Sequence, residues 1–366
     1  MAGQGSKMWA RAAMCAAALV TPLVVSGCQS ATNATGSGGA VAPQAGASSS
    51  PSAVVSTSAA PTGGASSSGA APASAPSQLN ATTGNGVTVS DGSGRILMNG
   101  KAVDFGTQVH DPSWSPDGTR VVFIDGGGNL VLANADGSGR IEAAHNPGGQ
   151  TWSHPTWQTT QADTKDNIPA RNNIFFASSA GGATLWEVPT TAHDAQPTQL
   201  TLNGYSGYGS TPPPASGNSW PAGGGKFGGA VYEHDNATSS DVYVRDNYLR
   251  QQGGLAIKDA AEPDYVLIGS SSTAEGAPEV VFVREVGAHK HVFVQQIGTS
   301  TGGTPSAARD LTPNATTDCT EPAISADGKT VVFSTSSGVV TVAADGSGTP
   351  AFVTNTPGFP AFRPGS

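Results

Sequence analysis

Four ionisable residues of this chain share one sequence position, directly before a proline. They are Asp111, His154, Glu262 and Glu321. Three carboxylates and an imidazole that meet in one place would favour a cation, a basic peptide segment or a polar glycan. The same side chains could instead cap turns, or pair with Arg120 and Lys329, and bind nothing. The outcome depends on the elements that carry them.

A second set of candidate binding residues lies in a long insert at 204–227, which is rich in glycine and proline. The candidates are Tyr205, Tyr208 and Trp220. Aromatic rings on such a loop suit sugar stacking or a protein hot spot. The alternative is that these rings cover the edge of a sheet.

Motifs for catalysis are not found in the sequence after residue 84. It contains no Gly-x-Ser-x-Gly elbow, and Cys319 stands without histidines at a metal-binding spacing. We therefore expect Cys319 to be a small buried side chain. We also expect no catalytic residue, no metal and no cofactor.

Five short apolar segments end on an aromatic ring, and the rings recur at successive intervals of 53, 56, 50 and 51 residues. The rings belong to Phe123, Phe176, Tyr232, Phe282 and Phe333. A repeat of roughly 40 to 50 residues built of short strands is typical of β-propeller blades, because one blade cannot bury both of its faces. The spacing therefore predicts an all-β propeller.

Turn chemistry locates the strands of the clearest repeat. A strand that ends in Trp114 is followed by the turn Pro-Asp-Gly at 116–118 and by a strand at 121–123. A near copy follows about 210 residues later, where 321–328 leads into a strand at 331–333. These units resemble the WD40-like repeat of TolB-type propellers, which implies six blades.

The two ends of the repeat region are expected to complete one blade together. Segments 87–90, 96–98 and 102–105 are predicted strands without an inner partner, and 359–362 repeats the innermost-strand pattern. Sharing a blade leaves no open sheet edge. We therefore expect a six-bladed propeller of antiparallel four-stranded blades over residues 85–366.

The resemblance also implies where ligands bind. In this family the residue before each anchor proline lies near the mouth of the central channel, which points to the four ionisable residues above and to Phe359. TolB contacts envelope proteins, but this chain has a tether where TolB has an α/β domain, so only binding carries over. Other propellers of this repeat type resemble metal-dependent glycan lyases. That alternative requires His110, His154 and His234 to converge.

The first 28 residues have the pattern of a secretory signal. Lys7 and Arg11 precede an apolar run from 12 to 25, which is too short for a permanent membrane span, and small residues lead into Cys28. This order resembles the bacterial lipobox, which implies lipid attachment at Cys28. The alternative is ordinary cleavage with Cys28 incidental. Residues 29–84 are mainly Ala, Ser, Gly, Thr and Pro, and are predicted to form a disordered tether.

The charge of the chain bears on its partners. Of 17 Lys and Arg residues, two leave with the signal, so the mature chain carries a net charge of about −11. So acidic a chain is a poor partner for nucleic acid. We expect a lipid-anchored monomer on the extracytoplasmic face of the cell membrane. It would bind an envelope protein or a cell-wall glycan without catalysis.

Overall fold

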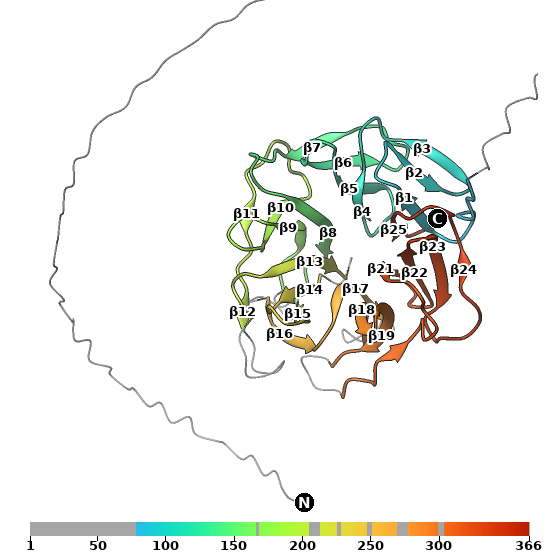
Figure 1. Ribbon diagram of the computed structural model, residues 1–366. Coiled ribbons are helices and arrows are strands. Elements are labelled where there is room, and N and C mark those ends of the chain that lie inside the picture. The colour runs from blue at the N-terminus through green and yellow to red at the C-terminus, as the bar shows by residue number, and fades with distance from the viewer. Residues whose placement is uncertain are drawn as a thin grey trace, which may run out of the picture. The chain divides into compact units, whose positions relative to one another are not determined.

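The computed structural model describes seven stretches of the chain, which Figure 1 shows in colour. They are residues 78–165, 168–204, 213–224, 228–246, 251–268, 277–298 and 304–365. In these stretches the regular elements are β-strands, and no helix suited to crossing a bilayer occurs. The predicted signal, Cys28 and most of the tether lie outside the described residues, as do Tyr205 and Tyr208.

The strands of the described residues form six sheets that follow one another around a ring (Figure 1). Each sheet is one blade, and its strands are named from the innermost outward. Blade 1 is β4 (His110–Trp114), β5 (Arg120–Ile124), β6 (Leu130–Asn134) and β7 (Ile141–Ala144); blade 2 is β8 (Trp152–Thr160), β9 (Arg171–Ser178), β10 (Thr184–Pro189) and β11 (Thr198–Gln199). Blade 3 is β13 (Asn218–Gly223), β14 (Ala230–Asp235), β15 (Ser240–Arg245) and β16 (Gln252–Ile257), with β12 (Asn203–Gly204) parallel at its outer edge.

The remaining three blades continue the same order. Blade 4 is β17 (Ala261–Ile268), β18 (Ala277–Val286), β19 (His289–Gln296) and β20 (Arg309–Asp310); blade 5 is β21 (Cys319–Ile324), β22 (Thr330–Thr335), β23 (Gly338–Ala343) and β24 (Ala351–Phe352). Blade 6 is β25 (Phe359–Phe362), β1 (Val87–Ser90), β2 (Arg95–Met98) and β3 (Lys101–Asp104). Each innermost strand contacts the next, and β25 contacts β4, so the ring is closed. The predicted six-bladed all-β fold is confirmed.

Blade 6 joins the two ends of the propeller. Strand β25 pairs antiparallel with β1 in a regular register from Val87 opposite Phe362 to Ser90 opposite Phe359. The buried Thr88 hydroxyl donates to the Ala361 carbonyl at 3.1 Å and accepts from the Trp114 indole at 2.9 Å. The predicted closing blade is therefore present, and it is hydrogen-bonded to blade 1.

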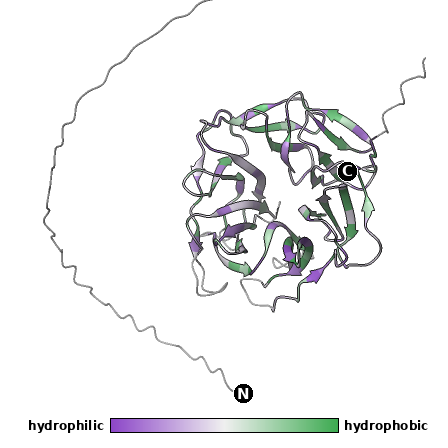
Figure 2. Ribbon diagram, in the orientation of Figure 1, coloured by the Kyte–Doolittle hydropathy of each residue, from purple (hydrophilic) through white to green (hydrophobic). Residues whose placement is uncertain are grey.

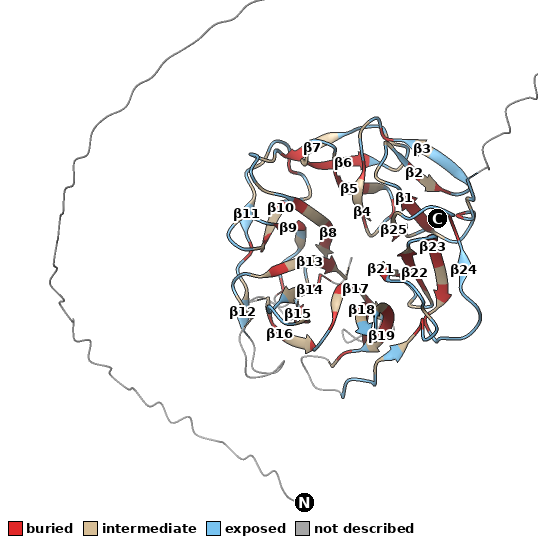
Figure 3. Ribbon diagram, viewed as in Figure 1, coloured by how far each residue is buried: buried red, intermediate tan, exposed pale blue. Residues whose placement is uncertain are grey.

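The hydrophobic core lies between the blades. The described apolar side chains form six buried clusters, and each cluster combines residues of two neighbouring blades. The five periodic aromatic rings are all buried in these clusters, with exposures between 0% and 2%. Figures 2 and 3 show the same pattern, since hydrophobic and buried residues concentrate on the strands. The rings are therefore packing residues.

The Pro-Asp-Gly turn requires its glycine. The Gly118 N–H donates to the Ser115 carbonyl at 2.8 Å, and Gly118 has a φ of 66°. A Cβ atom there would overlap the carbonyl oxygen of Pro364 near the C-terminus. The copy in blade 5 has the same turn, with Gly328 at a φ of 70° bonded to Ser325.

Residues 78–84 contact the propeller ahead of its first strand. The Ala81 N–H donates to the Val353 carbonyl at 2.9 Å, and the Gln78 amide donates to Thr356 at 3.1 Å. The first described residues therefore lie against the outer edge of blade 5.

Candidate functional site

Five innermost strands contain the same β-bulge. In β8 the pairing with β9 shifts between Ser153 and Thr156. Over this segment three residue steps along β8 lie opposite two residue steps along β9. The same shift occurs in β4, β13, β17 and β21, while β25 is regular. The residue before the proline has a positive φ in each bulge: Asp111 50°, His154 49°, Trp220 49°, Glu262 51° and Glu321 53°.

A left-handed conformation is unusual for these residue types, and more so before proline. A bulge changes the direction in which a side chain points. Because the same bulge recurs in five blades, it directs five side chains in an equivalent way. These residues lie on the innermost strands of the ring, and we refer to their common position as the mouth.

Hydrogen bonds between blades hold the carboxylates of the mouth. The His154 N–H donates to Asp111 Oδ2 at 2.9 Å, and the Glu321 N–H donates to Glu262 Oε2 at 2.9 Å. In blade 3 the equivalent position is Trp220, which has no carboxylate. In blade 3 the carboxylate that accepts a hydrogen bond from the next blade comes from Glu233 of β14, whose Oε2 accepts from the Glu262 N–H at 2.9 Å.

The side chains of Asp111, His154 and Glu321 come together at this mouth. The Nδ1 atom of His154 lies 3.8 Å from Asp111 Oδ2, and its Nε2 atom lies 3.9 Å from Glu321 Oε2. The Asp111 and His154 side chains are 10% and 18% exposed. One donor atom from each of the three residues lies within 4.8 Å of the others. We call these three residues the mouth triad.

Trp220 covers one face of the triad histidine. Its ring stacks on the His154 ring with centroids 3.5 Å apart and an angle of 25°. The prediction that Trp220 belongs to a loop is wrong, because Trp220 lies in strand β13. The missed signal was Pro221, which follows Trp220 as the other anchor prolines follow their residues.

Charge and burial oppose each other at the triad. Burial lowers the pKa of His154, but Asp111 and Glu321, with a smaller effect of Glu262, outweigh it, so that pKa lies above its ordinary value. Burial raises the pKa of Glu321, although His154 partly opposes this. The charge of each side chain therefore shifts the pKa of the other.

Glu262 has a counter-ion that no sequence pattern predicted. The Lys290 ammonium of β19 lies 2.7 Å from Glu262 Oε1. Burial lowers the pKa of Lys290, but the hydrogen bond and the charge of Glu262, with smaller effects of Glu233 and Asp318, together outweigh burial and raise that pKa. The lysine considered from sequence, Lys329, pairs with Asp327 instead. Glu262 is thus neutralised on one oxygen and hydrogen-bonded on the other.

The three histidines of the lyase alternative do not form one ligand group among the described residues. His110 packs edge-on against Phe359, with ring centroids 5.6 Å apart. His234 lies 3.2 Å from Asn218 Oδ1 and packs against Tyr243. His154 alone of the three belongs to the triad.

Comparison with known proteins places the fold. No protein-family model matches the chain, and no curated protein matches it. A chain of a nidogen–laminin complex matches with a TM-score of 0.50 at 10% identity, covering 76% of this chain and 97% of that chain. A TolB protein from Agrobacterium tumefaciens matches with a TM-score of 0.47 at 15% identity, covering 78% and 96%.

An oligogalacturonate lyase in complex with manganese also matches, with a TM-score of 0.34 at 14% identity, covering 56% of this chain and 55% of that chain. The likeness at such identities concerns the fold. By its fold and site the protein is a six-bladed β-propeller with an acidic, histidine-containing mouth.

Proposed function

We propose that the chain is a lipid-anchored, extracytoplasmic binding module that takes a cell-envelope ligand at the channel mouth. The observation that carries this proposal is the set of five equivalent bulges, which place polar and aromatic residues of five blades at the same position of the innermost strands. Side chains held in advance lose little entropy when a ligand binds.

The charge of the mouth supports recognition of a polar ligand. Among the described residues, the carboxylates of Asp111, Glu321 and Glu262 are paired with two basic groups, His154 and Lys290. A surplus of carboxylates attracts groups that donate hydrogen bonds or carry positive charge. Both an envelope protein and a cell-wall glycan offer such donors.

Capture from envelope extracts tests the binding proposal. The immobilised chain should retain a ligand that the double variant Glu262→Lys, Glu321→Lys loses. A matched control is Glu142→Lys, because Glu142 lies on β7 at the outer side of blade 1. Mass spectrometry would identify a protein ligand, and sugar analysis a glycan. Equal capture by all three forms would refute binding at the mouth.

Membrane fractionation tests the anchor separately. A lipid on Cys28 should keep the chain in the membrane fraction, and Cys28→Ser should release it. Retention of Cys28→Ser in membranes would contradict lipid anchoring at this residue, and would leave the capture result unaffected.

A further inference from the structure

We propose that Asp111, His154 and Glu321 bind a divalent transition-metal ion. The sequence predicted no metal ligands, since the three residues lie far apart in the chain and on three different blades. The inference concerns the ion alone and goes beyond the proposed function. It is independent of which macromolecule the mouth binds.

The imidazole of His154 lies within ion-pair distance of two carboxylates but makes no hydrogen bond. Both of its ring nitrogens are shielded from solvent and have no hydrogen-bond partner among the described residues. The carboxylate oxygens at 3.8 and 3.9 Å are too far away for hydrogen bonds. A buried polar atom without a partner costs about 1–3 kcal/mol, so such atoms call for an explanation. A metal ion would supply a partner for one of the two ring nitrogens.

The three donor atoms enclose a space of suitable size. Because they all lie within 4.8 Å of one another, they share a point no more than about 2.8 Å from each. Zinc–nitrogen and zinc–oxygen distances are about 2.0–2.2 Å, so a small inward movement of the side chains would complete an ion site. A water molecule would also fit at the 2.8 Å limit, and the titration below distinguishes it from an ion.

Contacts around the triad hold its ligands firmly. The Asp111 carboxylate is bonded to the His154 backbone, and the Glu321 backbone is bonded to Glu262. Trp220 fixes the plane of the imidazole by stacking on it. Outer contacts of this kind orient metal ligands and raise affinity.

The donor set indicates the class of ion. One imidazole nitrogen and two carboxylates suit Zn²⁺ or Mn²⁺ better than Ca²⁺ or Mg²⁺, which prefer oxygen ligands throughout. Binding of the ion displaces any proton on the ligating imidazole nitrogen, and the triad then has a charge of −2, which a divalent ion balances. Three protein ligands leave a coordination position for water or a ligand oxygen.

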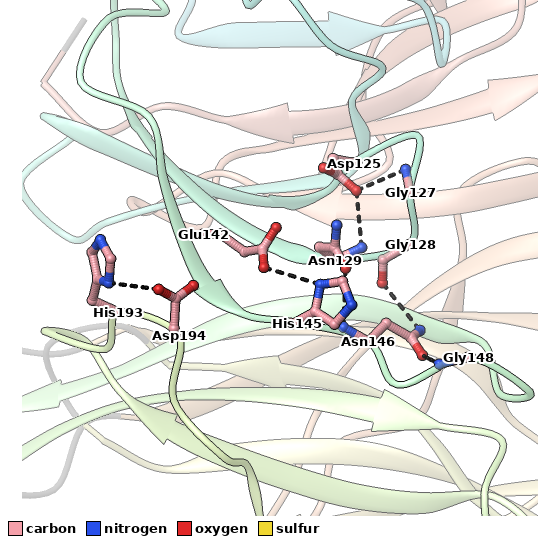
Figure 4. A network of polar contacts seen from close by, with 10 residues as sticks. All are labelled: Asp125, Gly127, Gly128, Asn129, Glu142, His145, Asn146, Gly148, His193 and Asp194. Atoms are coloured by element: carbon pink, nitrogen blue, oxygen red, sulfur yellow. Dashed lines mark hydrogen bonds and ion pairs between the residues drawn. The ribbon is translucent and has the colours of Figure 1, made fainter.

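Two other histidine–carboxylate pairs lack these properties. His145 lies 3.1 Å from Glu142, and His193 lies 3.1 Å from Asp194 (Figure 4). The two histidines are 69% and 73% exposed, and neither pair belongs to a three-residue ligand group among the described residues. They provide matched controls for weak surface binding.

Calorimetric titration of the metal-stripped full-length chain tests the proposal. Zn²⁺ and Mn²⁺ should each bind at one ion per chain, and more tightly than Ca²⁺ or Mg²⁺. Asp111→Asn, His154→Gln and Glu321→Gln should each weaken binding by about 100-fold or more. The double variant His145→Gln, His193→Gln should bind as the wild type does. Near-ultraviolet circular dichroism would verify that each variant is folded.

A second measurement needs no change to the ligands. Co²⁺ bound in the triad should quench the fluorescence of Trp220, so the quenching should shrink in Trp220→Phe. The proposal is overturned if the wild type binds neither Zn²⁺ nor Mn²⁺. It is also overturned if binding survives in Glu321→Gln, or if it disappears in the His145, His193 control. If the chain still captures an envelope ligand after metal removal, capture does not require the ion, and the binding proposal stands independently of the metal proposal.

Discussion

His154 of blade 2 meets Glu321 of blade 5, with Nε2 and Oε2 3.9 Å apart. Blades 2 and 5 are opposite each other, because two blades separate them on either side of the ring (Figure 1). The contact therefore spans the axis of the propeller.

Asp264 predicts a pH dependence of stability. Burial raises its pKa to about 6, although the Ile324 and Tyr265 N–H groups donate to it and lower the pKa. Since the ordinary pKa of this side chain is 3.8, the folded protein binds the proton more tightly than the unfolded chain does. The protonated Asp264 carboxyl therefore contributes fully to the free energy of unfolding below pH 4. This contribution is lost as the pH rises to 6, and the loss lowers the free energy of unfolding by up to about 3 kcal/mol.

Asp264→Asn keeps an acceptor for the Ile324 N–H and removes the charge. The variant should be more stable than the wild type at pH 7, and its stability should change less between pH 4 and 6. Urea unfolding at several pH values would measure this. Asp136→Asn is the control, because hydrogen bonds from Ser138 lower the pKa of Asp136 and its titration falls below this window. If the free energy of unfolding of Asp264→Asn changed between pH 4 and 6 as much as that of the wild type, the assignment of this pH dependence to Asp264 would be wrong.

Thr88→Val should weaken the closing blade. The substitution keeps the shape of the side chain but leaves the buried Trp114 indole N–H without its acceptor. We expect a loss of about 1–3 kcal/mol in the free energy of unfolding. Thr341→Val is a suitable control, because its hydroxyl bonds to Ala351 at an exposed edge. Equal effects of the two substitutions would argue against a special role of Thr88.

Gly118→Ala and Gly348→Ala separate backbone strain from a steric clash. Both glycines have positive φ, 66° and 79°, so each substitution carries strain of about 1–2 kcal/mol. A Cβ atom at Gly348 meets no atom within 4 Å, whereas at Gly118 it overlaps Pro364. Pro364 is held in place because Arg363 bonds to the Gly118 carbonyl at 2.8 Å. Thermal unfolding should show the larger loss for Gly118→Ala.

Thiol counting tests both the anchor and the core. The sequence has three cysteines, of which Cys15 would leave with the signal. Cys319 is 3% exposed, and burial raises its pKa to about 11, so it should not react in the native state. Chain isolated from membranes should show no reactive thiol when native and one when denatured. A reactive thiol in the native chain would indicate an unmodified Cys28.

The repeat and its turns carried much of the fold prediction. Aromatic strand ends such as Phe123 and Phe333 must be buried, and Asp-Gly turns allow few backbone conformations, so both are readable from sequence. The positions before the prolines were also identified, except for Trp220. It escaped because Pro221, inside the long insert at 204–227, was not recognised as an anchor proline.

Contacts across the axis could not be predicted from the repeat. The distance from His154 to Glu321 depends on how the bulges turn each side chain, and residues before proline normally avoid the left-handed region. The pairing of Glu262 with Lys290 depends on how β17 and β19 lie on either side of β18 in blade 4, and no local sequence pattern encodes it. Tertiary packing fixed these relationships.

The pairing of Val87 with Phe362 also has a consequence for the order of folding. Strand β1 is synthesised early, yet it lacks an inner neighbour until β25 has been made, which is about 270 residues later. Contacts so distant in sequence form slowly, since a long loop must close first. Cooperative folding of the whole ring therefore waits for its final strand, and a ribosome-bound intermediate would expose blade 6 to proteases longest.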